Sequence, residues 1–295
     1  MDHVTRAVLR YDEADGGRLA AAVTYYAFFA TFSLGLLGFA VFAFALDDPA
    51  VLQSVERYAA ENLPHIDVQQ LRNARNTAGV IAFVGLPISG WFWVDVMRSS
   101  IRKIWGLTEY PGKLVVRVLV DMGVLAGLGV LLAASLWVAY VTTTIAGRAV
   151  DAADATPSRW PLAVVGLVLG LAVNMVLAAG MLTGLPRIRM PIRRVLAPAL
   201  LVSVGLEGLK TLGRLYVRAT EANPTYHLVG GSVGLLVFLS AVNQLVLFAA
   251  ALTATSGTGR PLDLAEGDHV DTSVDQPPPR GGPPAAERAA DWHAE

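Results

Sequence analysis

Long stretches without a charged residue are the feature that most constrains how this chain can fold. A helix needs about 20 apolar residues to cross the roughly 30 Å hydrocarbon core of a bilayer. Charged residues are only 16% of the chain, against about 25% in a typical soluble domain. We therefore predict an all-α integral membrane protein. Five uncharged runs meet or approach the required length: 19–46, 76–94, 122–147, 160–186 and 227–259.

A sixth apolar segment, 195–217, is interrupted by Glu207, Lys210 and Arg214. Loop charge decides its status, because cytoplasmic loops are enriched in Lys and Arg. The N-terminal segment carries three such residues, the loop after the second run five and the loop after the fourth run four, whereas the loop between the third and fourth runs carries two. This alternation favours a bundle of six transmembrane helices with both termini in the cytoplasm. The predicted spans are about 19–46, 76–95, 118–147, 160–186, 195–217 and 228–255.

Two segments outside the spans show helical periodicity. In 1–18, Val4, Ala7, Val8 and Tyr11 recur every three or four residues with arginines opposite, which predicts a short interfacial helix on the inner leaflet. In the 47–75 loop, Leu52, Val55, Ala59 and Leu63 repeat in the same way. We expect an amphipathic helix there, capping the outer face of the bundle.

The last segment, 256–295, differs from the rest in composition. It holds eight Asp and Glu against three Arg, and six of the sixteen prolines. Such a segment buries too little apolar surface to fold by itself. We predict a disordered, acidic, Pro-rich cytoplasmic tail that follows a membrane domain over 19–255.

Charged and amide side chains within the predicted spans mark the candidate site, because an ionisable group costs on the order of 3 kcal/mol at mid-bilayer. Glu207, Lys210, Thr211 and Arg214 fall on one helical face, with Glu207 near the midplane. This pattern favours an interior polar path over the alternative, in which Glu207 and Lys210 only neutralise each other and lock helix packing. An amide taken singly more often only joins helices by a hydrogen bond, and three polar centres at one depth make a shared cavity more plausible. Amides at similar depth extend the candidate path: Asn174, Asn243 and Gln244.

Basic residues also collect at the predicted cytoplasmic ends of the second and fourth spans. They serve either to fix topology or to attract anionic head groups or solutes. Glycine pairs such as Gly166 and Gly170, or Gly123 and Gly127, are consistent with close helix crossings. The predicted basic rim consists of Arg98, Arg102, Lys103, Arg187, Arg189, Arg193 and Arg194.

Enzyme signatures are missing from the sequence. The five histidines are scattered, there is no cysteine, and neither a P-loop nor a G-x-S-x-G motif occurs. We therefore expect no catalytic residues, no metal, no cofactor and no nucleic-acid partner. The expected partners are membrane lipids and an unidentified transported substrate, and a homo-oligomer stays open.

Four short motifs, in this order along the chain, resemble the YihY/BrkB family of bacterial inner-membrane proteins, including its YhjD branch. They are LAAAVTYYAFF from Leu19, IRKIWG from Ile101, EGLK from Glu207, and Tyr226 followed by Gly230-Gly231. The resemblance covers roughly 8–255 and departs at Ser33, where the family usually has proline, and at Arg102, where asparagine is frequent. It implies a six-span fold in the bacterial inner membrane and a transport-like role, in moving envelope lipid, lipid precursors or another anionic solute.

Two other functions compete with transport. A non-catalytic scaffold of the cell envelope would use the tail as its docking element, and its function would be lost when 256–295 is deleted. A membrane-bound ribonuclease is implied by an old label, ribonuclease BN, carried by some family members. We regard that label as unsupported, because the sequence offers no base, nucleophile or metal cluster facing water.

Overall fold

The computed structural model describes residues 3–49, 51–53, 68–110, 115–127, 129–130, 133, 160–220, 227–259 and 261–265. Apart from one pair of two-residue strands, the elements in these ranges are helices. Residues 115–127 and 129–130 are helical and include the start of the predicted third span. In chain order, the other elements are α1 (His3–Glu13), α2 (Gly16–Ala45), α4 (Val68–Trp105), α6 (Trp160–Thr183), β1 (Ile188–Arg189), α7 (Ile192–Thr220), α8 (His227–Ala254) and β2 (Leu262–Asp263).

Five of these helices are long and apolar enough to cross a membrane: Gly16–Phe44, Asn73–Trp105, Gly166–Thr183, Ile192–Tyr216 and Gly231–Ala254. They correspond to five of the six predicted spans. The predicted third span, 118–147, extends beyond the described residues, so the count of six stays a prediction. Large apolar side chains stand exposed on these helices, with Phe83 79% and Val237 65% exposed. Such a surface suits hydrocarbon rather than water.

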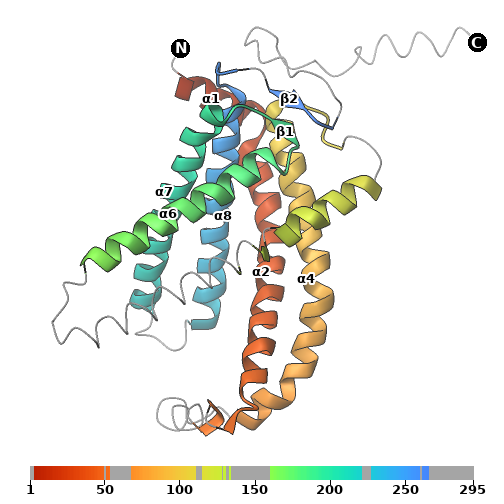
Figure 1. The fold of residues 1–295 in the computed structure, drawn as a ribbon, viewed down its shortest axis with the longest axis vertical. Coiled ribbons are helices and arrows are strands. Elements are labelled where there is room, and N and C mark those ends of the chain that lie inside the picture. Colours follow the sequence, from red (N-terminus) through yellow and green to blue (C-terminus); the bar gives the residue numbers. More distant parts are fainter. Residues whose placement is uncertain are drawn as a thin grey trace, which may run out of the picture.

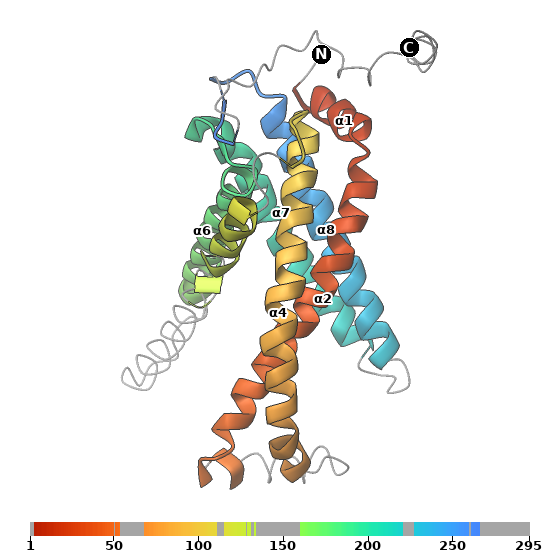
Figure 2. The same cartoon turned by 90° about the vertical axis from the view of Figure 1, so that its right-hand side faces the viewer.

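The helices form two packed groups that meet at α8 (Figures 1 and 2). Helices α2 and α4 lie side by side along the long axis, and α7 packs between α6 and α8, which in turn contacts α2 and α4. With 38 residues, α4 is longer than the predicted span 76–95. At 1.5 Å per residue it measures about 57 Å, so it extends beyond a ~30 Å hydrocarbon core.

Helix α1 and both strands share one end of the molecule, which we call the strand end (Figure 1). The main apolar core includes α4 residues near this end, among them Met97, Ile101 and Ile104, each 0% exposed. Helix α1 lies within the predicted N-terminal segment and packs against α8. Its Ala7 is fully buried, and the ring of Tyr11 meets Phe248 edge-on, with centroids 6.1 Å apart.

The first residues of the predicted disordered tail are ordered, so that prediction is wrong for them. Strand β2 pairs antiparallel with β1, placing Ile188 opposite Asp263, and Leu264 N donates to Arg187 O at 2.9 Å. The physical reason is the side chain of Asp263, which is 2% exposed and forms an ion pair with Arg102. The rest of the predicted tail, 266–295, lies outside the described residues.

The amphipathic helix predicted in the 47–75 loop falls mainly on 54–67, which also lie outside the described residues. The last part of that loop, from Val68 onward, belongs to α4. Helix α4 therefore begins well before the uncharged run that located the second span.

Candidate functional site

The carboxylate of Glu207 lies at the middle of α7 and faces α6. Its Oε1 accepts hydrogen bonds from Asn174 Nδ2 at 2.9 Å and from Lys210 Nζ at 2.5 Å. Gly170, one turn before Asn174, permits this approach, because a Cβ there would lie 3.2 Å from Glu207 Oε1. A charge at mid-span thus has an opposite charge and an amide as partners, as an intramembrane carboxylate requires.

The polar face of α7 continues from Glu207 away from the strand end. Thr211 Oγ1 donates to the Glu207 carbonyl at 2.9 Å, and Arg214 Nη2 donates to Thr211 Oγ1 at 3.1 Å. The Lys210 side chain is 43% exposed, against 20% for Glu207. Among the residues that the structure describes, no carboxylate lies within 4.0 Å of Arg214. We call Glu207, Lys210, Thr211 and Arg214 the α7 stripe.

The two adjacent amides of α8 do not join this stripe. Asn243 is 3% exposed and donates to Thr24 Oγ1 of α2 at 3.1 Å. Gln244 donates to Ser240 Oγ at 3.3 Å on its own helix. The structure therefore brings Asn174 together with the α7 stripe. It places Asn243 at the contact between α2 and α8, and Gln244 makes its hydrogen bond within α8, so neither belongs to the stripe.

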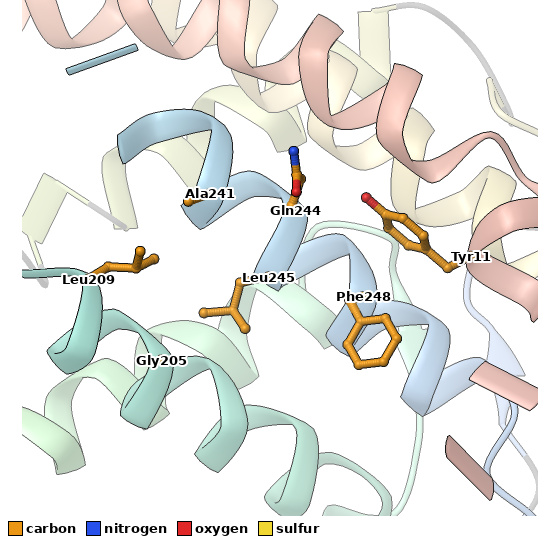
Figure 3. A pocket seen from close by; sticks show the side chains of 7 residues that line it. All are labelled: Tyr11, Gly205, Leu209, Ala241, Gln244, Leu245 and Phe248. Atoms are coloured by element: carbon orange, nitrogen blue, oxygen red, sulfur yellow. The ribbon is translucent and has the colours of Figure 1, made fainter. Parts of the chain in front are cut away.

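Gln244 borders a pocket of about 450 Å³ between α1, α7 and α8. Figure 3 shows its amide beside the hydroxyl of Tyr11, above an otherwise apolar lining. Burial raises the pKa of the Tyr11 hydroxyl above its ordinary value. The remaining lining residues are Gly205, Leu209, Ala241, Leu245 and Phe248.

At the strand end, Arg98 is 1% exposed and forms ion pairs with Asp95 and Asp121. Asp121 stands on the helical segment 115–127, so this pair ties that segment to α4. Arg117 Nε lies 3.7 Å from Asp95 Oδ1. The sequence reasoning missed Asp121, although an isolated acid at the start of an apolar run was a signal that it needs a basic partner.

Two further rim arginines are buried inside the protein. Arg102, 0% exposed, donates to both carboxylate oxygens of Asp263, at 2.7 and 3.1 Å, and to the carbonyl of Pro186 at 2.8 Å. Arg194, 2% exposed, donates to the carbonyls of Thr253 and Ala254 at 2.7 and 3.1 Å. Those carbonyls end α8, where a cation also meets the negative end of the helix dipole.

The predicted basic rim is therefore not one continuous exposed surface. Three of its seven members, Arg98, Arg102 and Arg194, are enclosed by their partners. Arg189 and Arg193 are exposed, and Lys103 is half-buried.

Arg187 differs from the other arginines. It is a non-glycine residue in the left-handed region, with φ 58°, and its Nε and Nη2 are buried without a hydrogen-bond partner. Burial lowers the pKa of its guanidinium, and the neighbouring charge of Arg98 adds to the effect. Within the described part of the chain, no group of three or more His, Cys, Asp or Glu residues is placed to hold a metal ion.

A family model described as "Virulence factor BrkB" matches residues 7–267. The chain belongs to the BrkB family. Two relatives each share 26% identity with it over 271 residues, covering 86% of this chain: the inner membrane protein YhjD of Escherichia coli (strain K12) and an uncharacterized protein of Dickeya dadantii (strain 3937). The alignments cover 80% and 83% of those relatives. No solved structure matches the chain.

The BrkB match encloses every site residue described above and ends two residues after the last described one, Ala265. It therefore includes β2 and Asp263, which the sequence reasoning had assigned to the tail. The BrkB-family part of the chain comprises the bundle together with this closing strand.

Proposed function

We propose that this BrkB-family chain is an inner-membrane transporter that moves an anionic substrate, an envelope lipid or lipid precursor, along the α7 stripe. One observation carries the proposal: Glu207, at mid-span, holds Lys210, whose side chain is still 43% exposed. The similarity to YhjD, an inner membrane protein, supports the location. We also propose that the strand end faces the cytoplasm, as the loop charges favour.

The stripe is suited to an anion by its charge. Lys210 and Arg214 against Glu207 leave one excess positive charge within the α7 stripe. A substrate anion approaching Lys210 competes with the Glu207 carboxylate for the same ammonium group. Asn174 then keeps Glu207 hydrogen-bonded while Lys210 turns to the substrate, so the buried acid is never left without a partner.

The test uses full-length protein in liposomes that contain fluorescently labelled phosphatidylglycerol, with dithionite quenching to follow movement between leaflets. We expect Lys210→Ala and Glu207→Gln each to slow the movement at least about tenfold. Lys210→Ala removes the cation that attracts the anion, and Glu207→Gln removes the carboxylate that displaces the anion from Lys210 again. Leu212→Ala is the matched control, since Leu212 lies on the same helix and is 62% exposed. Labelled phosphatidylcholine, which has no net charge, tests selectivity for anions.

A thermal unfolding measurement separates transport from packing. If the pair serves only to join α6 and α7, both variants lose stability and transport falls only as folded protein is lost. If it forms a path, transport falls while the melting temperature stays close to that of wild type. Movement of the labelled lipid that is the same in wild-type, variant and protein-free liposomes would refute the proposal.

A further inference from the structure

Charged side chains from distant parts of the chain meet at the strand end. Among the residues that the structure describes, four arginines and three aspartates interact there, so the arginines exceed the aspartates by one. They come from α4, the helical segment 115–127, the β1 connection and β2. The members of this charge cluster are Arg98, Arg102, Arg117, Arg187, Asp95, Asp121 and Asp263.

The three carboxylates form ion pairs with arginines other than Arg187. Arg98 pairs with Asp95 and Asp121, and Arg102 donates hydrogen bonds to both carboxylate oxygens of Asp263. Arg117 lies near Asp95 and places its guanidinium carbon 4.8 Å from the centre of the Tyr110 ring. Among the described residues, no carboxylate lies within 4.0 Å of Arg187. Asp121 attracts Arg187 only from a greater distance, so Arg187 is the arginine of this cluster that has no carboxylate in contact.

Two hydrogen-bond donors of Arg187 are buried without an acceptor, which costs free energy. Its Nε and Nη2 are shielded from solvent and bonded to nothing, and so are Arg98 Nε and Arg117 Nε. Buried donors are almost always satisfied in folded proteins, so each exception requires an explanation. The left-handed backbone of Arg187 adds conformational strain, which collects at ligand-binding positions. The backbone of Arg187 is held in this conformation by a hydrogen bond that Leu264 N donates to the Arg187 carbonyl.

We propose that Arg187, supported by Arg98 and Arg117, binds a phosphoryl anion at the strand end. Arg187 Nε, Arg187 Nη2 and Arg98 Nε are buried donors without a hydrogen bond. The oxygens of a phosphoryl group point in tetrahedral directions around one phosphorus and can meet donors from several arginines, whereas the two oxygens of a carboxylate lie in one plane. Guanidinium groups match phosphate oxygens in geometry and remain charged when buried. A phosphodiester, with one negative charge, neutralises the excess. This site is separate from the α7 stripe, and binding to it does not depend on transport.

Binding is tested on the purified full-length protein in detergent by calorimetric titration at constant ionic strength. The probes are inorganic phosphate and dihexanoyl phosphatidylglycerol, a soluble lipid with a phosphodiester head group. We expect Arg187→Asn to weaken binding about tenfold or more, the effect of losing a charge-assisted contact. Asparagine tolerates the left-handed backbone, and Arg187→Gly, which relieves the strain entirely, serves as a second variant if the first folds poorly.

Arg189→Gln is the matched control. It removes the same charge two residues away, from an exposed side chain on β1, and should change the affinity less than twofold. Binding of both probes, or of inorganic phosphate alone, identifies the phosphoryl group itself as the ligand. Binding of the lipid alone identifies a phospholipid head group as the source.

Any of three results would refute the proposed site: no binding of either probe to the wild-type protein, wild-type affinity in the Arg187 variants, or equal weakening by Arg189→Gln and Arg187→Asn. The third result would indicate diffuse electrostatic attraction rather than a defined site. Loss of binding in Arg187→Asn with normal lipid movement in liposomes leaves the transport proposal intact, and the reverse result leaves this site intact.

Discussion

Asp263→Asn removes the carboxylate that neutralises Arg102 in the interior of the strand end. Both side chains are buried, at 0% and 2% exposure, and the contact is bidentate, at 2.7 and 3.1 Å. Removing one partner of a buried pair costs about 3–5 kcal/mol, because the other charge is left without compensation. Arg102 keeps the carbonyls of Pro186 and Thr108, so we expect the lower part of this range.

The matched control is Asp15→Asn, which makes the same chemical change in an exposed pair. Asp15 and Arg18 lie 2.6 Å apart, but their side chains are 55% and 72% exposed. An exposed pair contributes at most about 1 kcal/mol. Asparagine also suits the left-handed backbone of Asp15, so the control adds no strain.

Thermal unfolding in detergent, followed by tryptophan fluorescence, measures the difference. At roughly 2–4 °C per kcal/mol, Asp263→Asn should lower the melting temperature by about 6 °C or more, and Asp15→Asn by at most a few degrees. Release of β2 alone is detected with Ile188→Cys, since Ile188 is 1% exposed and the chain has no cysteine. Maleimide should label this thiol faster in the Asp263→Asn background. Equal melting temperatures for the two asparagine variants, with unchanged labelling, would refute the buried pair.

Two further predictions concern α6 and α1. Gly170→Leu should destabilise the protein by about 1–3 kcal/mol, because its side chain displaces Glu207 from α6; Gly166→Leu, at a position where an added Cβ would meet nothing within 4 Å, should be nearly neutral, and equal melting temperatures would contradict the contact. Burial raises the pKa of Tyr11 above its ordinary 10.0, so the folded state favours the neutral phenol. Its contribution is complete below about pH 10 and is lost as pH rises through the folded-state pKa; Tyr11→Phe should remove this part of the alkaline loss, and an unchanged pH profile of unfolding would argue against it.

The apolar runs predicted the spans because they measure what the bilayer demands. Helices α2, α6, α7 and α8 begin and end within three residues of the predicted spans. The length of helix α4 was underestimated, because hydropathy locates only the part of a helix that lies in hydrocarbon. The part of α4 after Asp95 is helical and packed in the core through Met97, Ile101 and Ile104, and hydropathy alone does not detect such packing.

The candidate site was predictable only along single helices. Glu207 and Lys210, three residues apart, share a face of α7 by helical geometry alone. Their partner Asn174 depends on α6 packing beside α7, which no local pattern reveals. Asn243 and Gln244 could have been separated in advance, because consecutive residues on a helix point about 100° apart and do not face one cavity.

The basic rim shows why counting arginines does not distinguish their roles. Asp95 lies three residues before Arg98 on the same helix, but Asp121 and Asp263, the other partners of Arg98 and Arg102, lie 23 and 161 positions away along the chain. Only the fold reveals these two ion pairs. Arg187 has the same charge and was counted in the same basic rim, yet among the described residues no carboxylate lies within 4.0 Å of it, and two of its nitrogens are buried without a hydrogen bond. Substitution of Arg98 or Arg102 should therefore act on stability, by leaving aspartates buried without a counter-charge. Substitution of Arg187 by asparagine or glycine should act on anion binding and leave stability unchanged or improved, since both remove the unsatisfied donors and both residues suit the left-handed backbone.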